Sequence, residues 1–137
     1  MEAADVRVPK WIHELHVQAS THLVLQSLPI TLDVLDLDGI RTVLATARNR
    51  FGPIDVLVNN AGIKSAERLM DGDRSKIQRT LAINTDAVLD LTRIVFDDSL
   101  KGRGGRVINI GSSISSRGAI FNYQAGGADY CYSKAIV

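Results

Sequence analysis

Two short stretches decide the fold, Gly105-Arg-Val-Ile-Asn-Ile-Gly-Ser-Ser113 and Tyr130-Cys-Tyr-Ser-Lys134. The first has β-branched residues bounded by glycines, which is typical of a buried parallel strand. It ends in small hydroxyl side chains, and the carboxyl ends of strands are where open α/β sheets bind ligands. The second stretch predicts a helix over residues 129–137. The sequence therefore predicts an α/β domain with a site between a strand end and a helix.

Tyr130 and Lys134 carry the chemistry of this predicted site. They are four residues apart, so on a helix both side chains share one face. An ammonium group beside a phenol favours the phenolate and lowers the tyrosine pKa from about 10 towards neutrality. Such a tyrosine can act as general acid or base on an alcohol or carbonyl. A serine hydroxyl from the neighbouring strand end can hold the same oxygen. These residues predict proton transfer that accompanies a hydride transfer.

Composition limits the possible functions of the chain. Its 137 residues suffice for one domain, and 16 basic against 15 acidic residues give no nucleic-acid-binding surface. Cys131 is the only cysteine, which excludes an intramolecular disulfide and favours a reducing compartment. The N-terminus lacks the pattern of a signal peptide, and no apolar run reaches the length of a membrane span. We expect a soluble cytoplasmic domain that binds neither membrane nor nucleic acid.

Residues 1–29 form an atypical N-terminal segment in this interpretation, and residues 30–137 form the α/β domain. A short amphipathic helix near Trp11 and a short strand at His22–Gln26 fit the pattern of the segment. All three histidines, His13, His16 and His22, lie in it. They have no zinc-binding spacing and no cysteine nearby, so we expect no metal site.

Strand and helix patterns alternate from Ile30 onwards. A strand is predicted at Ile30–Val34, a helix from Ile40 to Phe51 and a second strand at Ile54–Val58. Carboxylates at residues 36 and 38 can cap the helix, and Gly52-Pro53 ends it. Strand, helix and strand in this order imply a right-handed crossover and a parallel sheet.

A longer helix is predicted over about residues 75–100, and Asn84 lies on its apolar stripe. A buried amide must be hydrogen-bonded, or it costs about 1–3 kcal/mol. Asn84 can simply bond backbone carbonyl groups or a buried water. It can also orient a water or a lysine near the active tyrosine. The two interpretations are compatible, and both stay open.

Five motifs in a fixed order extend the argument: Asp33-Val34, Asn59-Asn60-Ala61-Gly62, Asn84, Ile108-Asn-Ile-Gly-Ser112 and Tyr130-x-x-x-Lys134. In this order they resemble the short-chain dehydrogenase/reductase family over about residues 30–137. The resemblance implies a Rossmann-like, doubly wound parallel sheet. It also implies hydride transfer between NAD or NADP and a carbonyl or alcohol of a small molecule. The choice between NAD and NADP and the substrate remain open.

The resemblance also assigns catalytic roles. Tyr130 would donate or accept the proton, and Lys134 would lower its pKa and bind the nicotinamide ribose. Ser112 would position the substrate oxygen, with Ser113 as the alternative. Asn84 would hold the water that links Lys134 to solvent.

The cofactor-binding residues implied by the resemblance are Asp33, Val34, Asn60, Ala61 and Gly62, together with Tyr130 and Lys134. Asp33 and Val34 would contact adenine, and Asn60 to Gly62 would line the cofactor cleft. From the residues alone, Asp33 could equally be a cap. The Asn-Asn-Ala-Gly run could equally be a turn.

Three departures from the family pattern stand out. The glycine-rich turn that holds the pyrophosphate is missing, because the first glycine is Gly39. The sequence ends three residues after Lys134. The connection from Ser112 to Tyr130 is long, with residues 121–128 looking inserted. We therefore expect an incomplete sheet, without the N-terminal glycine-rich βα unit and the C-terminal elements, rather than a new fold.

Two hypotheses on function follow. The first is an NAD(P)-dependent oxidoreductase of the short-chain type. The second is a non-catalytic, truncated remnant or interaction module. Full-length relatives assemble as homo-oligomers through the long helix and the Tyr130 helix, and the shortness of the latter argues against an oligomer here.

Overall fold

The computed structural model describes residues 26–65, 67–68, 71–116 and 127–136. Contacts divide the chain into two units, Met1–Thr31 and Leu32–Val137, and every helix and strand below belongs to the second. The division expected at residue 30 stays a prediction. The expected elements near Trp11 and at His22–Gln26, and the three histidines, lie outside the described residues.

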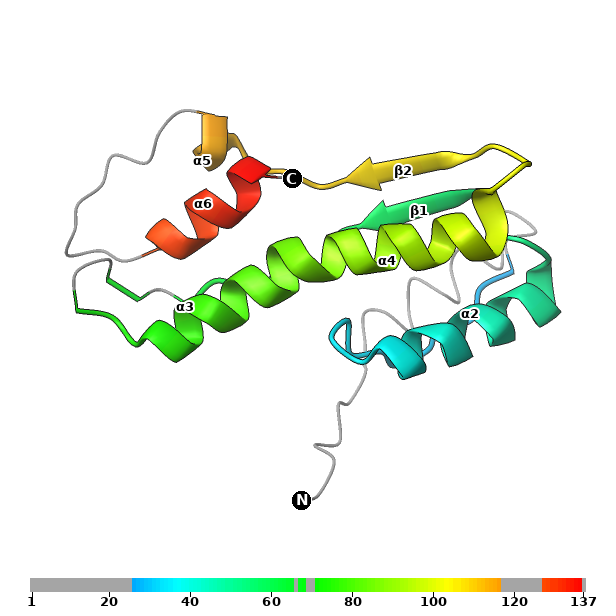
Figure 1. The fold of residues 1–137 in the computed structure, drawn as a ribbon, viewed down its shortest axis with the longest axis horizontal. Helices are drawn as coiled ribbons and strands as arrows, with labels where there is room; N and C mark the ends of the chain where they lie inside the picture. Colours follow the sequence, from blue (N-terminus) through cyan, green and yellow to red (C-terminus); the bar gives the residue numbers. More distant parts are fainter. Residues whose placement is uncertain (1–25, 66, 69–70, 117–126, 137) are drawn as a thin grey trace, which may run out of the picture. The chain divides into compact units, whose positions relative to one another are not determined.

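Helix α2 spans Leu37–Phe51 and confirms the first predicted helix (Figure 1). Asp36 caps its start, because the carboxylate accepts a hydrogen bond of 3.0 Å from the Gly39 backbone N–H. Gly52 ends it with φ of 87°, a left-handed conformation that favours glycine. The Gly52 N–H donates to the Arg48 carbonyl oxygen at 2.8 Å.

Strands β1 (Val56–Asn59) and β2 (Arg106–Asn109) form a parallel pair. Val58 lies opposite Ile108 and Asn59 opposite Asn109, so both strands end at the same edge. This confirms the predicted parallel sheet, with two strands among the described residues.

The strand predicted at Ile30–Val34 is wrong, because these residues have no strand structure in the described chain. Asp33 instead begins a turn. Its carbonyl oxygen accepts from the Asp36 N–H and its carboxylate from the Leu35 N–H, both at 3.0 Å. A strand requires a ladder partner, and no described strand lies beside this segment.

A continuous helical run over residues 74–100 confirms the long helix. It consists of α3 (Arg74–Leu81), the π-helical turn η1 (Ala82–Asp86), α4 (Ala87–Val95) and a second π-helical turn η2 (Phe96–Leu100). In η1 the Ala87 N–H bonds the Ala82 carbonyl, five residues back. Single π-helical turns occur frequently at functional sites, and η1 contains Asn84.

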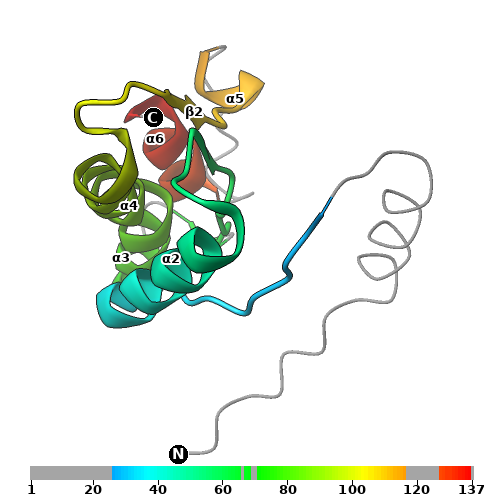
Figure 2. The same cartoon turned by 90° about the vertical axis from the view of Figure 1, so that its right-hand side faces the viewer.

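The hydrophobic core lies between α2, α4 and β1. It is formed by buried residues of α2, α4 and η2, with Leu57 of β1 packed against them: Ile40, Leu44, Ile94, Val95 and Leu100. Figure 1 and Figure 2 both show α2 running beside α4. Side chains alternate along a strand, so Val56 and Val58 point to the other face, where both are exposed, as is Ile108.

Among the described residues, two further helices follow β2. Helix α5 (Ser113–Ser116) is a short turn, and α6 (Ala128–Ile136) confirms the predicted Tyr130 helix. Helix α6 packs against α3 and η1. Most of the predicted insertion at residues 121–128 lies outside the described chain. Among the described residues, no helix is both long enough and apolar enough to cross a membrane.

Candidate functional site

Asn59, at the end of β1, links the carboxyl ends of the two strands. Its side chain is buried, and Nδ2 donates to Asn109 Oδ1 at 2.8 Å and to Thr92 Oγ1 at 3.1 Å. These bonds join β1 to the end of β2 and to α4. The exposed segment Asn60–Gly62 therefore leaves the sheet from a fixed point. The sequence analysis included Asn59 in the Asn-Asn-Ala-Gly motif without giving it a role of its own, although an amide at the end of a buried strand indicated a buried bond.

Asn84 is fully buried in η1 and makes three hydrogen bonds. Its Oδ1 accepts from the Ile63 N–H at 2.8 Å, and Nδ2 donates to the Ile63 carbonyl oxygen and to Ser133 Oγ, each at 2.9 Å. Both amide protons are used, so a water on this side chain would have to donate to Oδ1. Asn84 thus ties the segment after Gly62 to helix α6.

Lys134 is 6% exposed and lies where α6 meets the end of β2. Its Nζ donates to the Ile110 carbonyl oxygen at 2.7 Å. A Cβ at Gly62 would lie 3.2 Å from Asn84 Oδ1 and 3.6 Å from Lys134 Nζ. The structure therefore brings three predicted site residues, Gly62, Asn84 and Lys134, into one place.

Tyr130 and the candidate serines lie at the margin of this cluster. Tyr130 is half-buried in the first turn of α6, and its carbonyl oxygen accepts from Ser133 Oγ at 2.9 Å. Ser112 is half-buried before α5, and its carbonyl oxygen accepts from the Ser115 N–H at 3.1 Å. The hydroxyl groups of Ser112 and Tyr130 share no hydrogen bond in the described part of the chain. The choice between Ser112 and Ser113 stays open.

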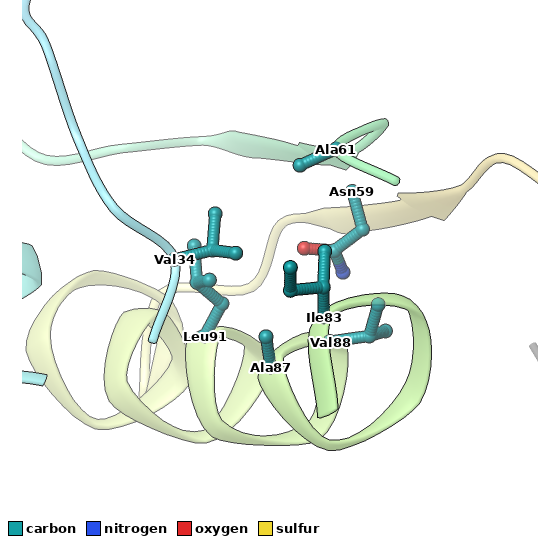
Figure 3. Close-up of a pocket in the computed structure, with 7 residues that line it drawn as sticks. All are labelled: Val34, Asn59, Ala61, Ile83, Ala87, Val88 and Leu91. Atoms are coloured by element: carbon teal, nitrogen blue, oxygen red, sulfur yellow. The ribbon is translucent and has the colours of Figure 1, made fainter. Parts of the chain in front are cut away.

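Val34 and Ala61, two of the predicted cofactor residues, line one small pocket with Asn59 (Figure 3). The remaining lining residues come from the long helical run: Ile83, Ala87, Val88 and Leu91. The cavity volume is about 10 Å³, so the pocket has room for one water and not for an adenine ring. A ring could lie only over its mouth. Asp33, next to Val34, is exposed and uses its carboxylate in the turn.

Asp129 is a buried carboxylate that sequence reasoning missed. Ser65 Oγ donates to its Oδ2 at 2.6 Å. Burial alone raises the pKa of Asp129, but hydrogen bonds from Ser65, Thr80 and the Tyr130 backbone outweigh it and hold the pKa below its ordinary value. An aspartate in the first turn of a predicted helix was the available signal.

No group of three or more His, Cys, Asp or Glu side chains in the described residues is arranged to hold a metal ion.

Comparison with known families identifies the fold. The family model described as "short chain dehydrogenase" matches residues 4–137. The chain belongs to the short-chain dehydrogenase family. The match begins well before residue 30, so it also covers the N-terminal segment that the sequence analysis left outside the resemblance. The chain holds an incomplete part of the Rossmann-like α/β fold of this family.

Individual members of the family are also similar to this chain. The chain is 37% identical over 108 residues to the 3-oxoacyl-[acyl-carrier-protein] reductase FabG of Haemophilus influenzae, covering 79% of this chain and 43% of the relative. It is 31% identical to the ketoacyl reductase HetN of a Nostoc species, covering 71% of this chain and 34% of the relative. A solved short-chain type dehydrogenase/reductase from Mycobacterium marinum superposes with a TM-score of 0.79 at 27% identity, covering 95% of this chain and 51% of that one. The chain thus spans less than half the length of these curated relatives.

Proposed function

We propose that this chain carries the proton-transfer machinery of an NAD(P)-dependent short-chain dehydrogenase that interconverts a carbonyl and an alcohol. The observation that carries the proposal is the convergence of Lys134, Asn84 and Gly62. Hydrogen bonds tie η1, α6 and the segment after β1 together there, and Lys134 is bonded to the end of β2. Tyr130 stands one helical turn before Lys134.

In the proposed mechanism, Tyr130 transfers the proton. Its phenol donates that proton to the carbonyl oxygen during reduction and takes it back during oxidation. Ser112, or Ser113, holds the substrate oxygen by a hydrogen bond. Asn84 fixes α6 against the segment after Gly62 and, through Oδ1, holds a water on the proton path.

A nicotinamide cofactor would supply or accept the hydride when bound. The described residues offer contacts for the nicotinamide ribose at one end of the cofactor and for the adenine at the other. Lys134 Nζ carries three protons and gives one to Ile110, so two can reach ribose hydroxyls. Gly62 lets the backbone pass close to Lys134, where a Cβ would crowd Asn84. Val34 and Ala61 form an apolar floor beside Asp33 for adenine. For the pyrophosphate, the described residues contain no glycine-rich turn at a helix N-terminus.

The substrate class is proposed from the relatives. Two of them are named as reductases of 3-oxoacyl or ketoacyl groups. We therefore propose a 3-oxoacyl thioester as the first substrate to try, with NADPH and NADH both tested. Cytoplasmic location stays a prediction, and so does the expectation that this chain forms no homo-oligomer.

A second candidate function is a non-catalytic member of the family. The exposed apolar face of the two-stranded sheet favours it. Val56 and Val58 are 48% and 51% exposed, although parallel sheets are normally covered on both faces. In this candidate, a sheet with one uncovered apolar face does not hold a cofactor.

The test is a titration of the purified chain with NADH and NADPH, followed by fluorescence and thermal melting. Saturable binding that raises the melting temperature supports the oxidoreductase, because a ligand that binds only the folded state stabilises it. Lys134→Met should weaken that binding, whereas Lys101→Met, an exposed lysine after η2, should not. Absence of binding to a chain that melts cooperatively would favour the non-catalytic candidate.

A further inference from the structure

Three hydrogen bonds fasten the beginning of α6 to the segment that follows Gly62. The Gly127 N–H donates to the Glu67 carbonyl oxygen at 3.0 Å. Two residues later, Asp129 Oδ2 accepts from Ser65 Oγ at 2.6 Å and from the Ser65 N–H at 3.4 Å. Tyr130 is the next residue. The first turn of α6 is therefore held in the chain region that begins at the proposed cofactor cleft.

The Ser65 hydroxyl is oriented by its surroundings. Its oxygen accepts from the Glu67 N–H at 3.2 Å, so its single proton points to Asp129. Threonine can reproduce both bonds, and alanine can reproduce neither. Comparing Ser65→Thr with Ser65→Ala therefore tests the hydrogen bonds of this hydroxyl group.

Asp129 is 6% exposed, and its charge suits its position. A carboxylate in the first turn of a helix interacts favourably with the positive end of the helix dipole. Its other oxygen, Oδ1, has no hydrogen-bond donor in the described chain. The neighbouring Thr80 hydroxyl gives its proton to the Lys76 carbonyl oxygen at 3.1 Å. Ser65 makes the largest favourable interaction with the carboxylate, and Thr80 and the Tyr130 backbone add smaller ones.

We propose that Ser65 and Asp129 form a positioning pair that sets where α6 begins and thereby where Tyr130 stands relative to the segment Asn60–Gly62. The inference rests on the proposed function, in which Tyr130 must reach the substrate oxygen. A displacement of about 1 Å at such a group can cost about 10²-fold in rate. Ser65 and Asp129 touch no reacting atom, so they act through Tyr130.

The experiment compares Ser65→Ala, Ser65→Thr and Asp129→Ala with a control, Asp90→Ala, which changes an exposed aspartate on α4. Turnover of a 3-oxoacyl thioester gives kcat and the KM for NADPH. In parallel, ¹³C-labelled tyrosine reports the pH titration of the Tyr130 ring, assigned with Tyr130→Phe among only three tyrosines. Thermal melting identifies variants that fail to fold, and Ser65→Ala keeps the carboxylate if Asp129→Ala does not fold.

We expect Ser65→Ala to lower kcat at least about 10-fold with the KM for NADPH within about 2-fold, and Ser65→Thr to restore it. The Tyr130 titration should move in Ser65→Ala and not in Asp90→Ala. Equal kcat and an unmoved titration in Ser65→Ala would overturn the pair. If the unmutated chain binds no cofactor, the proposed function fails by itself. The Tyr130 titration then tests the positioning pair without catalysis. A shift in Ser65→Ala supports the pair as a determinant of the Tyr130 position, and no shift overturns it.

Discussion

Asn84 Nδ2 donates to Ser133 Oγ at 2.9 Å, across 49 positions of sequence. Ser133 in turn donates to the Tyr130 carbonyl oxygen at 2.9 Å. This short chain of bonds joins the π-helical turn η1 to the helix that carries both Tyr130 and Lys134. Helix α6 is therefore positioned by buried polar contacts as well as by apolar packing.

Asn84→Ala should destabilise the fold. The change leaves the fully buried Ser133 hydroxyl and the part-buried Ile63 N–H and carbonyl groups without their Asn84 partner. We expect a loss of about 2–4 kcal/mol in the free energy of unfolding, measured by urea denaturation. Asn49→Ala, an exposed amide on α2, is the matched control and should change it by less than about 0.5 kcal/mol.

Stability should fall in acid, in part through Asp129. The folded-state pKa of Asp129 is below its ordinary value, so its contribution is fully present above about pH 4. It is lost as the pH falls through the folded-state pKa. Urea unfolding between pH 7 and pH 3 should therefore show a smaller acid loss in Asp129→Asn than in the unmutated chain. Identical pH profiles would contradict the assignment.

Glu67 and Asp73 also contribute to this acid profile. Hydrogen bonds from the Asp73 backbone and the Lys76 side chain lower the pKa of Glu67, and bonds from the Ser75 side chain and backbone lower that of Asp73. Both carboxylates remain in Asp129→Asn. Some acid sensitivity should therefore persist in that variant.

Gly62→Ala should disturb the site more than the fold. Its Cβ would stand 3.2 Å from Asn84 Oδ1, closer than ordinary contact, and would approach Lys134 Nζ. We expect NADPH affinity to fall about 10-fold while the melting temperature changes little. Fluorescence titration measures the affinity. Unchanged affinity would separate Gly62 from the cofactor cleft.

The next prediction tests the hydrophobic core. Ile40 of α2 is 1% exposed and lies in the core between α2 and α4. Ile40→Ala should cost about 2–5 kcal/mol, because the change removes buried contacts and leaves a cavity. Leu37→Ala on the same helix is the control, since Leu37 is 44% exposed. Equal effects in the two variants would show that α2 does not pack as described.

Much of the fold could be predicted from local patterns. The Asp36 cap and the Gly52 stop bound α2 because capping and positive φ are local properties. The apolar stripe placed Asn84 inside the structure, and the four-residue spacing placed Tyr130 and Lys134 on α6. The strand at Ile30–Val34 could not be decided this way, because a strand depends on a partner elsewhere in the chain.

The Ser65–Asp129 contact was invisible for a related reason. It joins residues 64 positions apart, and neither belongs to a recognisable motif. The long-range bonds of Asn59 and Ser133 were equally hidden, although both residues lie inside motifs. Sequence patterns indicate which residues are buried or helical, whereas pairing across the fold requires coordinates.

The most direct test of the central claim is turnover of a 3-oxoacyl thioester with NADPH by Tyr130→Phe, compared with Tyr132→Phe. Tyr132 lies on the same helix and is 61% exposed, so its change should leave kcat within about 2-fold. Tyr130→Phe removes only the phenolic hydroxyl and should lower kcat by about 10²–10⁴-fold with NADPH affinity nearly unchanged. Turnover retained in Tyr130→Phe would contradict the account.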